Sequence, residues 1–561
     1  MGLNSEEWVI ASIGAIMAGG FSVGILSSSS AKACQVIAEN TEMDFFVVDD
    51  NRQLQKVLQI QGSLKHLQAI VQYKEDLQVK QENLYSWKGF LNLAKAVPDD
   101  TLDKVVDSQR PNQCCTVVYS LASTGPSKAV MLSHDNITWT TAATIQSLCY
   151  KCPPEGQEVL VNYLPLSYIG AQIFDMWVAI SVAGALYFAQ PDALKGSLMD
   201  TLREVRPTTF CGVPWMWDRM YDAMKTRQLD SSGFWRMIDK WAMRLGLQTN
   251  RRRMSGHVHP PLCFRLAKKL TFDGAKKALG LDHCQQFFSM GLGLSRVTQE
   301  FFLSLDIPIF QLYGLTECTG VHTLSSYEAF QVLSCGKGLP DTHTKVPEED
   351  ENKIGEIYLW GRNIFMGYLN NKEGTEKKMD SHGWLHTGDL GFLDDSDFLY
   401  VMGNIKDTIT LSSGQKIHPT PIEERVKLSI PIVRYAVVVG QDAPYLCALL
   451  TLKCQINSET GEPRDVLTSE AVAFCRKLRS QPTRLTDIIL DRDPLVSDFI
   501  SQSIEAINSE ASSDGARIVK WTILDTDFSV GGGELGATMK LRRAAVTKIY
   551  QEEIESFYKD D

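Results

Sequence analysis

The sequence predicts an α/β protein in which a large layered domain is followed by a smaller α+β domain. Its 561 residues are enough for about three or four domain-sized units. Short apolar runs rich in β-branched residues alternate with helix-length segments, and this pattern changes near residue 400. Hydrophobic residues make up 44% and charged residues 22% of the chain. This composition is ordinary for a globular protein and excludes disordered, collagen-like and coiled-coil chains.

The strands of the large domain are predicted from five apolar runs, at residues 115–119, 159–164, 185–189, 208–213 and 307–313. Segments long enough for helices separate these runs. We therefore expect mostly parallel strands, with helices packed on the faces of the sheets.

Near residue 400 the pattern becomes that of a separate domain, and we place the boundary near Gly403. A strand at 398–402 is followed by a predicted hairpin that begins at 407 and turns at residues 412–415. The rest comprises strands at 436–439, 446–452 and 518–524, a helix near 501–509, and an amphipathic helix from about 541. We therefore predict one domain over residues 1–403 and a second over residues 404–561.

The uncharged run from Trp8 to Leu26 is long enough to span a membrane. It contains several glycines and serines, however, and it follows Glu6 and Glu7 where a signal peptide has positive charge. We interpret it as a buried helix and strand of the large α/β core, and we expect no membrane anchor.

The charge balance bears on the ligands. Lys and Arg number 56 against 67 Asp and Glu, a net charge of −11, which excludes a broadly basic nucleic-acid-binding surface. An anionic ligand would therefore need a local site. The 13 scattered cysteines indicate a reducing compartment. We interpret the single pair Cys149 and Cys152 as incidental thiols.

A loop of small residues follows the first long strand of the large domain. It runs from Tyr119 to a lysine, with the candidate phosphate-binding residues Ser120, Ser123, Thr124, Gly125 and Lys128. Hydroxyl residues and glycine allow backbone N–H groups to approach phosphate oxygens, and the lysine adds a positive charge. The spacing does not match a Walker P-loop, and an ordinary surface turn is an equally supported alternative.

A second motif ends the predicted strand at 307–313. Tyr313 and Gly314 place an aromatic ring beside a residue without a side chain, an arrangement that can stack on a base. Thr316 and Glu317 follow, and carboxylates bind Mg²⁺ alongside phosphates. The alternative is an exposed turn at a strand end.

Two further motifs lie toward the C terminus. Asp389 stands between glycines in the segment 383–391, where its carboxylate can accept hydrogen bonds from ribose hydroxyls. Lys540 follows the glycine-rich segment 532–536 and can reach into a cleft between domains. The alternative for Lys540 is a solvated basic residue at a helix start. The order and spacing of the four motifs are more specific than any one of them.

These motifs resemble those of the adenylate-forming acyl-CoA synthetases of the AMP-binding superfamily. The strings at residues 4–8, 187–195, 202–207, 361–368 and 383–391 resemble, more narrowly, the bubblegum-type long-chain fatty acyl-CoA synthetases. The resemblance extends over almost the whole chain. Such enzymes carry a substantial portion before the segment that matches residues 4–8, so we expect this chain to start inside the large adenylate-forming domain.

The resemblance implies a ligase that uses ATP, Mg²⁺ and CoA in two half-reactions. A fatty carboxylate attacks the α-phosphate of ATP and gives acyl-adenylate and pyrophosphate. The mobile C-terminal domain then rotates, and the CoA thiolate displaces AMP. Long-chain specificity rests on the resemblance alone.

The same resemblance assigns the site residues. Catalysis is implied for Lys540, Glu317 and Thr124, and metal binding for Glu317 and Thr124. Binding of ATP or AMP is implied for Ser120, Ser123, Thr124, Gly125, Lys128, Tyr313, Gly314, Thr316, Glu317, Asp389, Asn404 and Lys540. Acyl binding is implied for Tyr168 and for Trp217, which falls at a gate-like aromatic of the acyl tunnel. The expected partners are fatty acid, ATP and CoA, without nucleic acid or an indicated protein partner. We expect a cytoplasmic protein, and the bilayer-soluble substrate favours peripheral contact with intracellular membranes.

Several residues depart from the family pattern, and they are concentrated at the site. Leu121 and Ala122 replace a serine and a glycine of the phosphate loop, and Tyr168 stands where the family has histidine. Met290 is expected to crowd the adenine side, and Asn404 stands where many relatives have arginine. On the CoA side, Ser413 and Gln415 alter a turn. One lost donor to a transition state typically lowers the rate about 10²–10³-fold.

Three hypotheses follow. The first is a long-chain fatty acid–CoA ligase. The second is a diverged, weak or inactive relative that binds nucleotide or acyl ligands or acts through protein partners. The third is adenylate chemistry on a different acid or acceptor, against which the bubblegum-type strings argue. Dependence of thioester formation on Lys540 separates the first two, and a panel of fatty acids tests the third.

Overall fold

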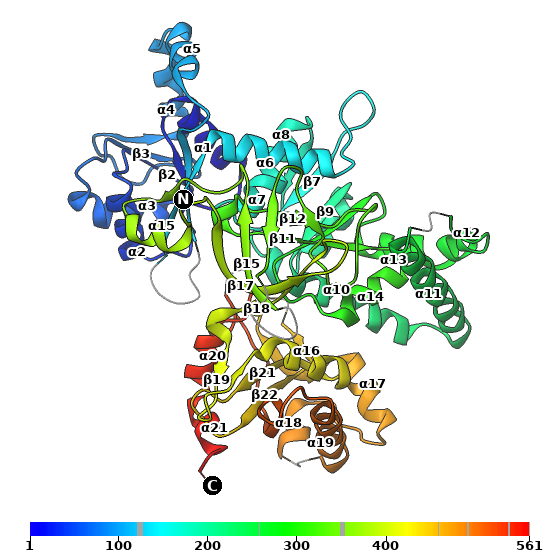
Figure 1. The fold of residues 1–561 in the computed structure, drawn as a ribbon. Coiled ribbons are helices and arrows are strands. Elements are labelled where there is room, and N and C mark those ends of the chain that lie inside the picture. Colours follow the sequence, from blue (N-terminus) through cyan, green and yellow to red (C-terminus); the bar gives the residue numbers. More distant parts are fainter. Residues whose placement is uncertain are drawn as a thin grey trace.

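The computed structural model describes residues 1–120, 127–256, 259–347, 354–457, 459–490, 493–536 and 539–559. A large α/β domain lies above a smaller domain that contains the C terminus (Figure 1). The hydrophobic cores divide in the same way. Three clusters of buried residues lie between Met1 and Leu399, and two lie between Ile409 and Phe557. A boundary at Gly403 itself stays a prediction.

A five-stranded sheet forms the centre of the large domain. Its strand order is β13-β12-β11-β10-β9, with bounds Lys337–Gly338, Thr323–Leu324, Ile309–Tyr313, Gln286–Met290 and Thr209–Gly212. Strands β9, β10 and β11 are parallel, as expected of strands joined through helices. The crossovers contain α10 (Pro214–Asp230), α11 (Gly233–Met254), α12 (Phe264–Ala267), α13 (Asp273–Leu279) and α14 (Arg296–Ser304). The runs predicted at 208–213 and 307–313 are confirmed as strands of this sheet.

A second sheet has the order β1-β5-β6-β16, with bounds Ser22–Val23, Cys114–Tyr119, Ala129–Ser133 and Gly367–Tyr368. Strands β5 and β6 are antiparallel, in contrast to the expected parallel layers. The physical reason is the connection: only residues 120–128 separate the two strands, and a parallel crossover needs about a dozen residues or more. The predicted phosphate loop therefore connects two antiparallel strands.

The remaining sheets of the large domain are smaller. Parallel pairs join β2 (Phe45–Val48), β3 (Ala69–Gln72) and β4 (Leu84–Ser86), and also β7 (Val159–Asn162) and β8 (Ala185–Phe188). An antiparallel sheet of β14 (His343–Lys345), β15 (Gly355–Trp360), β17 (Leu385–Leu393) and β18 (Leu399–Asn404) adjoins the small domain (Figure 1). The other helices of this domain include α2 (Ala31–Asn40), α3 (Asn51–Ile60), α4 (Trp87–Leu93), α5 (Asp99–Ser108), α6 (His134–Ser147), α7 (Ile169–Ala171), α8 (Val178–Ser181), α9 (Leu198–Val205) and α15 (Lys372–Lys378).

The small domain is built on a three-stranded sheet of β21 (Val433–Val439), β22 (Leu446–Leu452) and β25 (Ile518–Ile523). The predicted hairpin is confirmed as β19 (Ile409–Thr410) and β20 (Lys416–Ile417). A second hairpin pairs β23 (Cys454–Ile456) with β24 (Pro463–Leu467). Its helices are α16 (Pro419–Ser429), α17 (Ser469–Lys477), α18 (Leu485–Leu490), α19 (Pro494–Ser509), α20 (Arg543–Ile549) and α21 (Gln551–Ser556). The single C-terminal helix expected from about 541 is therefore two short helices.

The uncharged N-terminal run folds as α1 (Glu6–Met17) and the short strand β1. Ser5 caps α1 by accepting a hydrogen bond from the backbone N–H of Trp8. Trp8 and Ile16 are buried while Ile10 and Met17 are exposed, so the helix is only partly buried and part of its exposed side is apolar. In the part of the chain that the structure describes, no helix combines the length and apolar character needed to cross a bilayer.

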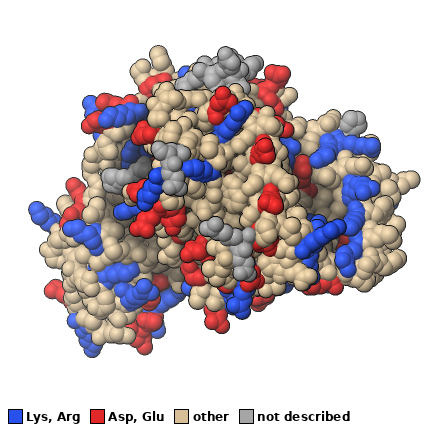
Figure 2. All heavy atoms as spheres, turned by 90° about the horizontal axis from the view of Figure 1, so that it is seen from below, with Lys and Arg blue, Asp and Glu red and all other residues tan. Residues whose placement is uncertain are grey.

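Surface charge and thiols agree with the composition. On the face seen from below, acidic and basic side chains are interspersed over the described residues (Figure 2). All 13 cysteines are free thiols, and both Cys149 and Cys152 are exposed.

Asp175 is a buried acidic group in the core of the large domain. It lies in the π-helical segment η3 (Gln172–Trp177), and Asn162 Nδ2 donates a hydrogen bond of 2.7 Å to its Oδ2. Burial raises the pKa of Asp175 to about 7, although the hydrogen bond from Asn162 acts in the opposite direction. The folded protein therefore keeps a proton that the unfolded chain loses at lower pH.

We predict that Asp175→Asn removes a loss of stability that the wild type undergoes as the pH rises from about 4 to about 7. The carboxyl titrates near its ordinary value of 3.8 in the unfolded chain and near 7 in the folded protein. Its contribution to stability is therefore lost as the pH rises through about 7. Between pH 5.5 and pH 8 the variant should gain about 2 kcal/mol relative to the wild type, measured by urea unfolding. The exposed Asp107→Asn serves as control, and a difference independent of pH would contradict this account.

Candidate functional site

Asp389 is the centre of the candidate site. It lies in β17 directly opposite Asn404 of β18, and Asn404 Nδ2 donates a 2.8 Å hydrogen bond to Asp389 Oδ1. Tyr313, the last residue of β11, donates from its hydroxyl to Asp389 Oδ2 at 2.7 Å. Asp389 and Tyr313 are both buried. Two neighbouring strands and the distant strand β11 therefore position one carboxylate.

The electrostatics of Asp389 combine opposing effects. Burial raises the pKa of its carboxyl, whereas hydrogen bonds from Tyr313 and Asn404 and the positive charges of Lys540 and Lys378 lower it. The carboxylate is thus fixed by donors while it remains next to two cations. Asn404 supplies a hydrogen bond to Asp389 without adding the charge of an arginine.

Glu317 lies in the short helix η6 (Thr316–Cys318), which is separated from the end of β11 by two residues, and it shares with Asp389 the neighbouring cation Lys378. The hydroxyl of Tyr368 donates to Glu317 Oε1 at 2.6 Å, and both residues are buried. The Nζ of Lys128 lies 4.7 Å from the centroid of the Tyr368 ring. Strand β16, which ends at Tyr368, pairs with β6. Lys128 directly precedes β6 and therefore reaches the ring of Tyr368. Glu317 and Lys128 therefore meet around Tyr368.

Lys540 comes from the small domain. Residues 537 and 538 lie outside the described chain, but Lys540 follows them in a turn closed by a 2.8 Å hydrogen bond from Gly536 N to its carbonyl oxygen. Its side chain is exposed, and its charge lowers the pKa of Asp389 across the domain boundary. The small domain is therefore oriented so that Lys540 faces the large-domain site.

The phosphate loop is described only at its ends. Backbone N–H of Ser120 donates to the carbonyl of Lys128 at 2.9 Å, which closes the loop. The predicted residues Ser123, Thr124 and Gly125, and the departures Leu121 and Ala122, lie outside the described residues. Their roles stay predictions.

Gly314 is required by close packing. A Cβ at this position would lie 2.6 Å from the carbonyl oxygen of Gly320. This oxygen belongs to the backbone and cannot move away as the end of a flexible side chain could. The absence of a side chain therefore lets the segment after β11 fold back, and Thr316 and Glu317 follow in η6.

Lys378 is a site residue that the sequence did not predict. It ends α15, and its Nζ donates to the carbonyl oxygens of His386 and Thr387 at 2.7 and 2.6 Å. Burial lowers the pKa of Lys378, while the nearby carboxylates of Glu317 and Asp389 raise it. The ammonium therefore fixes the backbone just before Asp389.

The sequence offered little signal for Lys378. The neighbouring Lys377 is exposed and pairs with Glu373 four residues earlier, as in an ordinary solvated helix. What separates the two lysines is a bridge between Met379 and Leu385, which folds the end of α15 onto β17. This long-range pairing is not visible in the local pattern.

Trp217, one of the two residues predicted for the acyl side, lies in the core of the large domain. Trp217 is 0% exposed, its Nε1 donates to the carbonyl of Phe288 at 3.0 Å, and its ring packs edge-on against Phe210 and Phe302. Gly212 makes room for this indole, because a Cβ there would lie 2.6 Å from Trp217 Nε1. The gate role of Trp217 stays a prediction.

Tyr168 and Met290 lie in neighbouring segments. The hydroxyl of Tyr168 is buried without a hydrogen-bond partner among the described residues, and burial raises the pKa of Tyr168 to about 12. The sulfur of Met290 would lie 2.3 Å from a Cβ on Gly170, so the two residues pack closely. Met290 therefore also contacts the segment that carries Tyr168, besides ending strand β10.

The departures on the predicted CoA side are placed at a hairpin tip. Gln415 Nε2 donates to Ser513 Oγ at 2.7 Å, which ties the turn between β19 and β20 to the loop before β25. Ser413 Oγ accepts a hydrogen bond from the backbone N–H of Gln415. The altered turn is thus held within the small domain.

Comparison with known proteins is consistent with this arrangement. The model of the AMP-binding enzyme family matches residues 1–369, and that of the AMP-binding enzyme C-terminal domain matches residues 406–473. Long-chain-fatty-acid–CoA ligase ACSBG2 of Xenopus laevis is 48% identical over 560 residues, covering 100% of this chain and 76% of that protein. The human ACSBG2 ligase is 45% identical over 559 residues (100% and 83%), and ACSBG1 of Mus musculus is 42% identical over 560 residues (100% and 78%).

Solved structures support the two-domain fold. The anthranilate CoA ligase AuaEII in complex with anthranoyl-AMP superposes with a TM-score of 0.67 at 15% identity, covering 99% of this chain and 87% of that chain. ATP-bound MatB from Rhodopseudomonas palustris gives a TM-score of 0.65 at 17% identity, with coverage of 98% and 87%. At such identities these likenesses concern the fold alone. The family model matches residues 1–369, and the ACSBG1 and ACSBG2 ligases match this chain over its whole length. We conclude that the chain belongs to the AMP-binding enzyme family, in its bubblegum-type branch.

Proposed function

We propose that the protein is an ATP-dependent, AMP-forming long-chain fatty acid–CoA ligase. The observation that carries this proposal is the buried carboxylate of Asp389, held by Tyr313 and Asn404, with Lys540 of the small domain near enough for its charge to lower the pKa of that carboxyl. If Asp389 binds the ribose of ATP, the α-phosphate would lie between Asp389 and Lys540. The positive charge of Lys540 is then placed to act on a reaction at that phosphate. The relatives that match the whole chain are named as ligases of this class.

In the proposed first step, a fatty carboxylate oxygen attacks the α-phosphorus of ATP, and pyrophosphate leaves. Lys540 would stabilise the charge that develops between the carboxylate and the α-phosphate. Each oxygen of Asp389 accepts one hydrogen bond from the protein and keeps acceptor capacity for a ribose hydroxyl. In the second step the CoA thiolate attacks the acyl carbonyl and AMP leaves.

The residues present fit a Mg²⁺ ion bound together with ATP. Tyr368 fixes Glu317 through Oε1, and no described residue donates a hydrogen bond to Oε2. Mg²⁺ is usually held by one or two carboxylates and by substrate phosphates, so Glu317 would hold the ion with Thr124 as the predicted second ligand. When bound, the ion would neutralise phosphate charge.

The alternative of a relative that binds ligands without turnover rests on Leu121, Ala122, Tyr168, Met290 and Asn404. Asn404 still donates to Asp389, which weakens that alternative at the ribose. We propose a cytoplasmic location with peripheral contact with intracellular membranes, because the substrate partitions into bilayers. No protein partner is proposed.

We predict that Lys540→Ala lowers thioester formation by about 10²–10³-fold, because one charge at the transition state is lost. The assay combines purified protein, ATP, Mg²⁺, CoA and a panel of fatty acids of increasing chain length. Lys548→Ala, an exposed lysine in α20 of the same domain, should retain activity. A folded wild-type protein whose product does not exceed that of Lys540→Ala would overturn the ligase proposal.

We also predict that Lys378→Met raises the KM for ATP on the order of tenfold while the protein stays folded. The expected cause is loss of two charge-assisted hydrogen bonds that fix the backbone before Asp389. Lys377→Met provides the matched control, since that side chain lies on the outer face of the same helix. Equal KM values in the two variants would exclude a positioning role for Lys378.

A further inference from the structure

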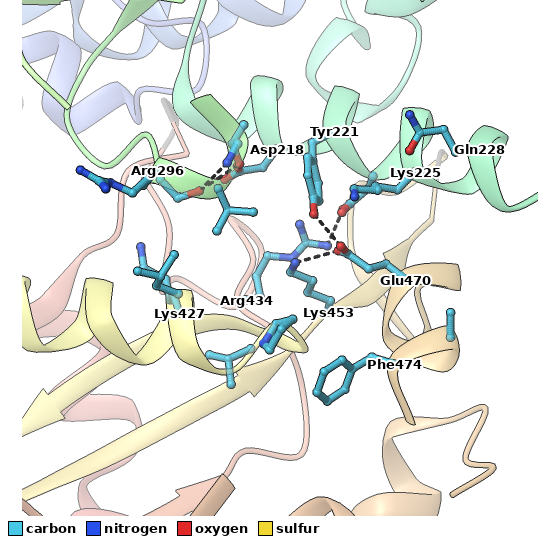
Figure 3. A pocket seen from close by; sticks show the side chains of 18 of the residues that line it. Asp218, Tyr221, Lys225, Gln228, Arg296, Lys427, Arg434, Lys453, Glu470 and Phe474 are labelled. Carbon is cyan, nitrogen blue, oxygen red and sulfur yellow. Dashed lines mark hydrogen bonds and ion pairs between the residues drawn. The ribbon is translucent and has the colours of Figure 1, made fainter. Parts of the chain in front are cut away.

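One face of helix α10 is turned toward the small domain. Asp218, Tyr221, Asp222 and Lys225 recur at intervals of three and four residues and therefore share that face. Figure 3 shows Tyr221 and Lys225 pointing toward Arg434, Lys453 and Glu470 of the small domain. Trp217 of the predicted acyl site lies near the start of the same helix.

Two direct contacts bridge the domains on this face. The Tyr221 hydroxyl donates to Glu470 Oε1 at 2.5 Å, and Lys453 Nζ holds Glu470 Oε2 at 2.8 Å. Arg434 Nη2 donates to Asp222 Oδ2 at 2.7 Å. Glu470 lies in α17, and Arg434 lies in β21.

The Arg434–Asp222 pair is specific to this domain orientation. The Arg434 side chain is 10% exposed and that of Asp222 19%, so solvent screens the pair only weakly. Within the small domain, Arg434 has a longer contact of 3.5 Å with Asp527. Rotation of the small domain would break the shorter contact and leave the Asp222 carboxylate to be rehydrated.

The surroundings of these contacts allow them to break when the small domain moves. They border a cavity of about 840 Å³ between the two domains, with further charged groups such as Lys225, Lys240 and Arg296 on its walls. A charged interface with a large cavity lacks the continuous apolar packing of a permanent one. Water can enter when the domains move apart.

We propose that Tyr221 and Asp222, with Glu470 and Arg434, form a latch that holds the small domain in the orientation that brings Lys540 to Asp389. This inference rests on the proposed function and adds the residues that favour its first half-reaction. The latch stabilises the adenylate-forming orientation and opens for transfer to CoA. Tyr221 and Asp222 are therefore positioning residues, because they act through the domain orientation and not on the substrate.

The test measures the two half-reactions separately in Tyr221→Phe and Asp222→Asn. The first is fatty-acid-dependent exchange of labelled pyrophosphate into ATP, and the second is thioester formation from supplied acyl-adenylate and CoA. We expect exchange to fall about tenfold, as for a lost hydrogen bond to a charged group, without a fall in the second step. Tyr221→Phe keeps the aromatic ring, so this variant is expected to fold and its loss of exchange can be assigned to the missing hydroxyl.

Glu300→Gln is the matched control, because its ion pair with Arg251 lies inside the large domain. It should leave the ratio of the two half-reactions unchanged. An equal fall in both half-reactions, or no change in either, would overturn the latch.

A wild-type protein that makes no acyl-adenylate would refute the proposed function, and small-angle X-ray scattering then tests the latch alone. A larger radius of gyration in Asp222→Asn than in the wild type supports it. Identical scattering overturns it.

Discussion

Asp389 is a buried carboxylate whose two oxygens are held by donors from different segments, the hydroxyl of Tyr313 and the amide of Asn404. Burial disfavours its charged form, so these donors and the neighbouring cations determine whether the carboxylate can act as an acceptor. The same contacts join β11 of the central sheet to the β17–β18 hairpin. The arrangement of the candidate site therefore depends on one satisfied buried charge.

The second organising element is the domain boundary. Strand β18 ends at Asn404, so a residue that holds Asp389 is also the last strand residue before the small domain. Lys540 and the residues that contact α10 both belong to the small domain. A rotation of the small domain would change both together, whereas the large-domain part of the site, with Tyr313, Glu317 and Asp389, would stay assembled. This separation suits a reaction with two successive half-reactions on one bound adenylate.

Much of the fold and part of the site could be predicted from the sequence. The strand that ends at Tyr313 and the segment around Asp389 were recognisable, because short apolar runs before glycine-rich turns mark strand ends. Lys378 was not, because its position depends on a pairing with β17 that no local pattern encodes. The β5–β6 hairpin was also missed. The alternation of runs favoured parallel strands, and only the nine-residue connection excludes a crossover.

The most direct test of the account is whether Asp389 recognises ribose hydroxyls. Calorimetric titration would compare the binding of ATP with that of 2′,3′-dideoxy-ATP to the wild type and to Asp389→Ala. The account predicts that the wild type binds ATP at least about tenfold more tightly than the dideoxy compound, and that Asp389→Ala binds both equally. Equal affinities in the wild type, or discrimination that survives in Asp389→Ala, would contradict it.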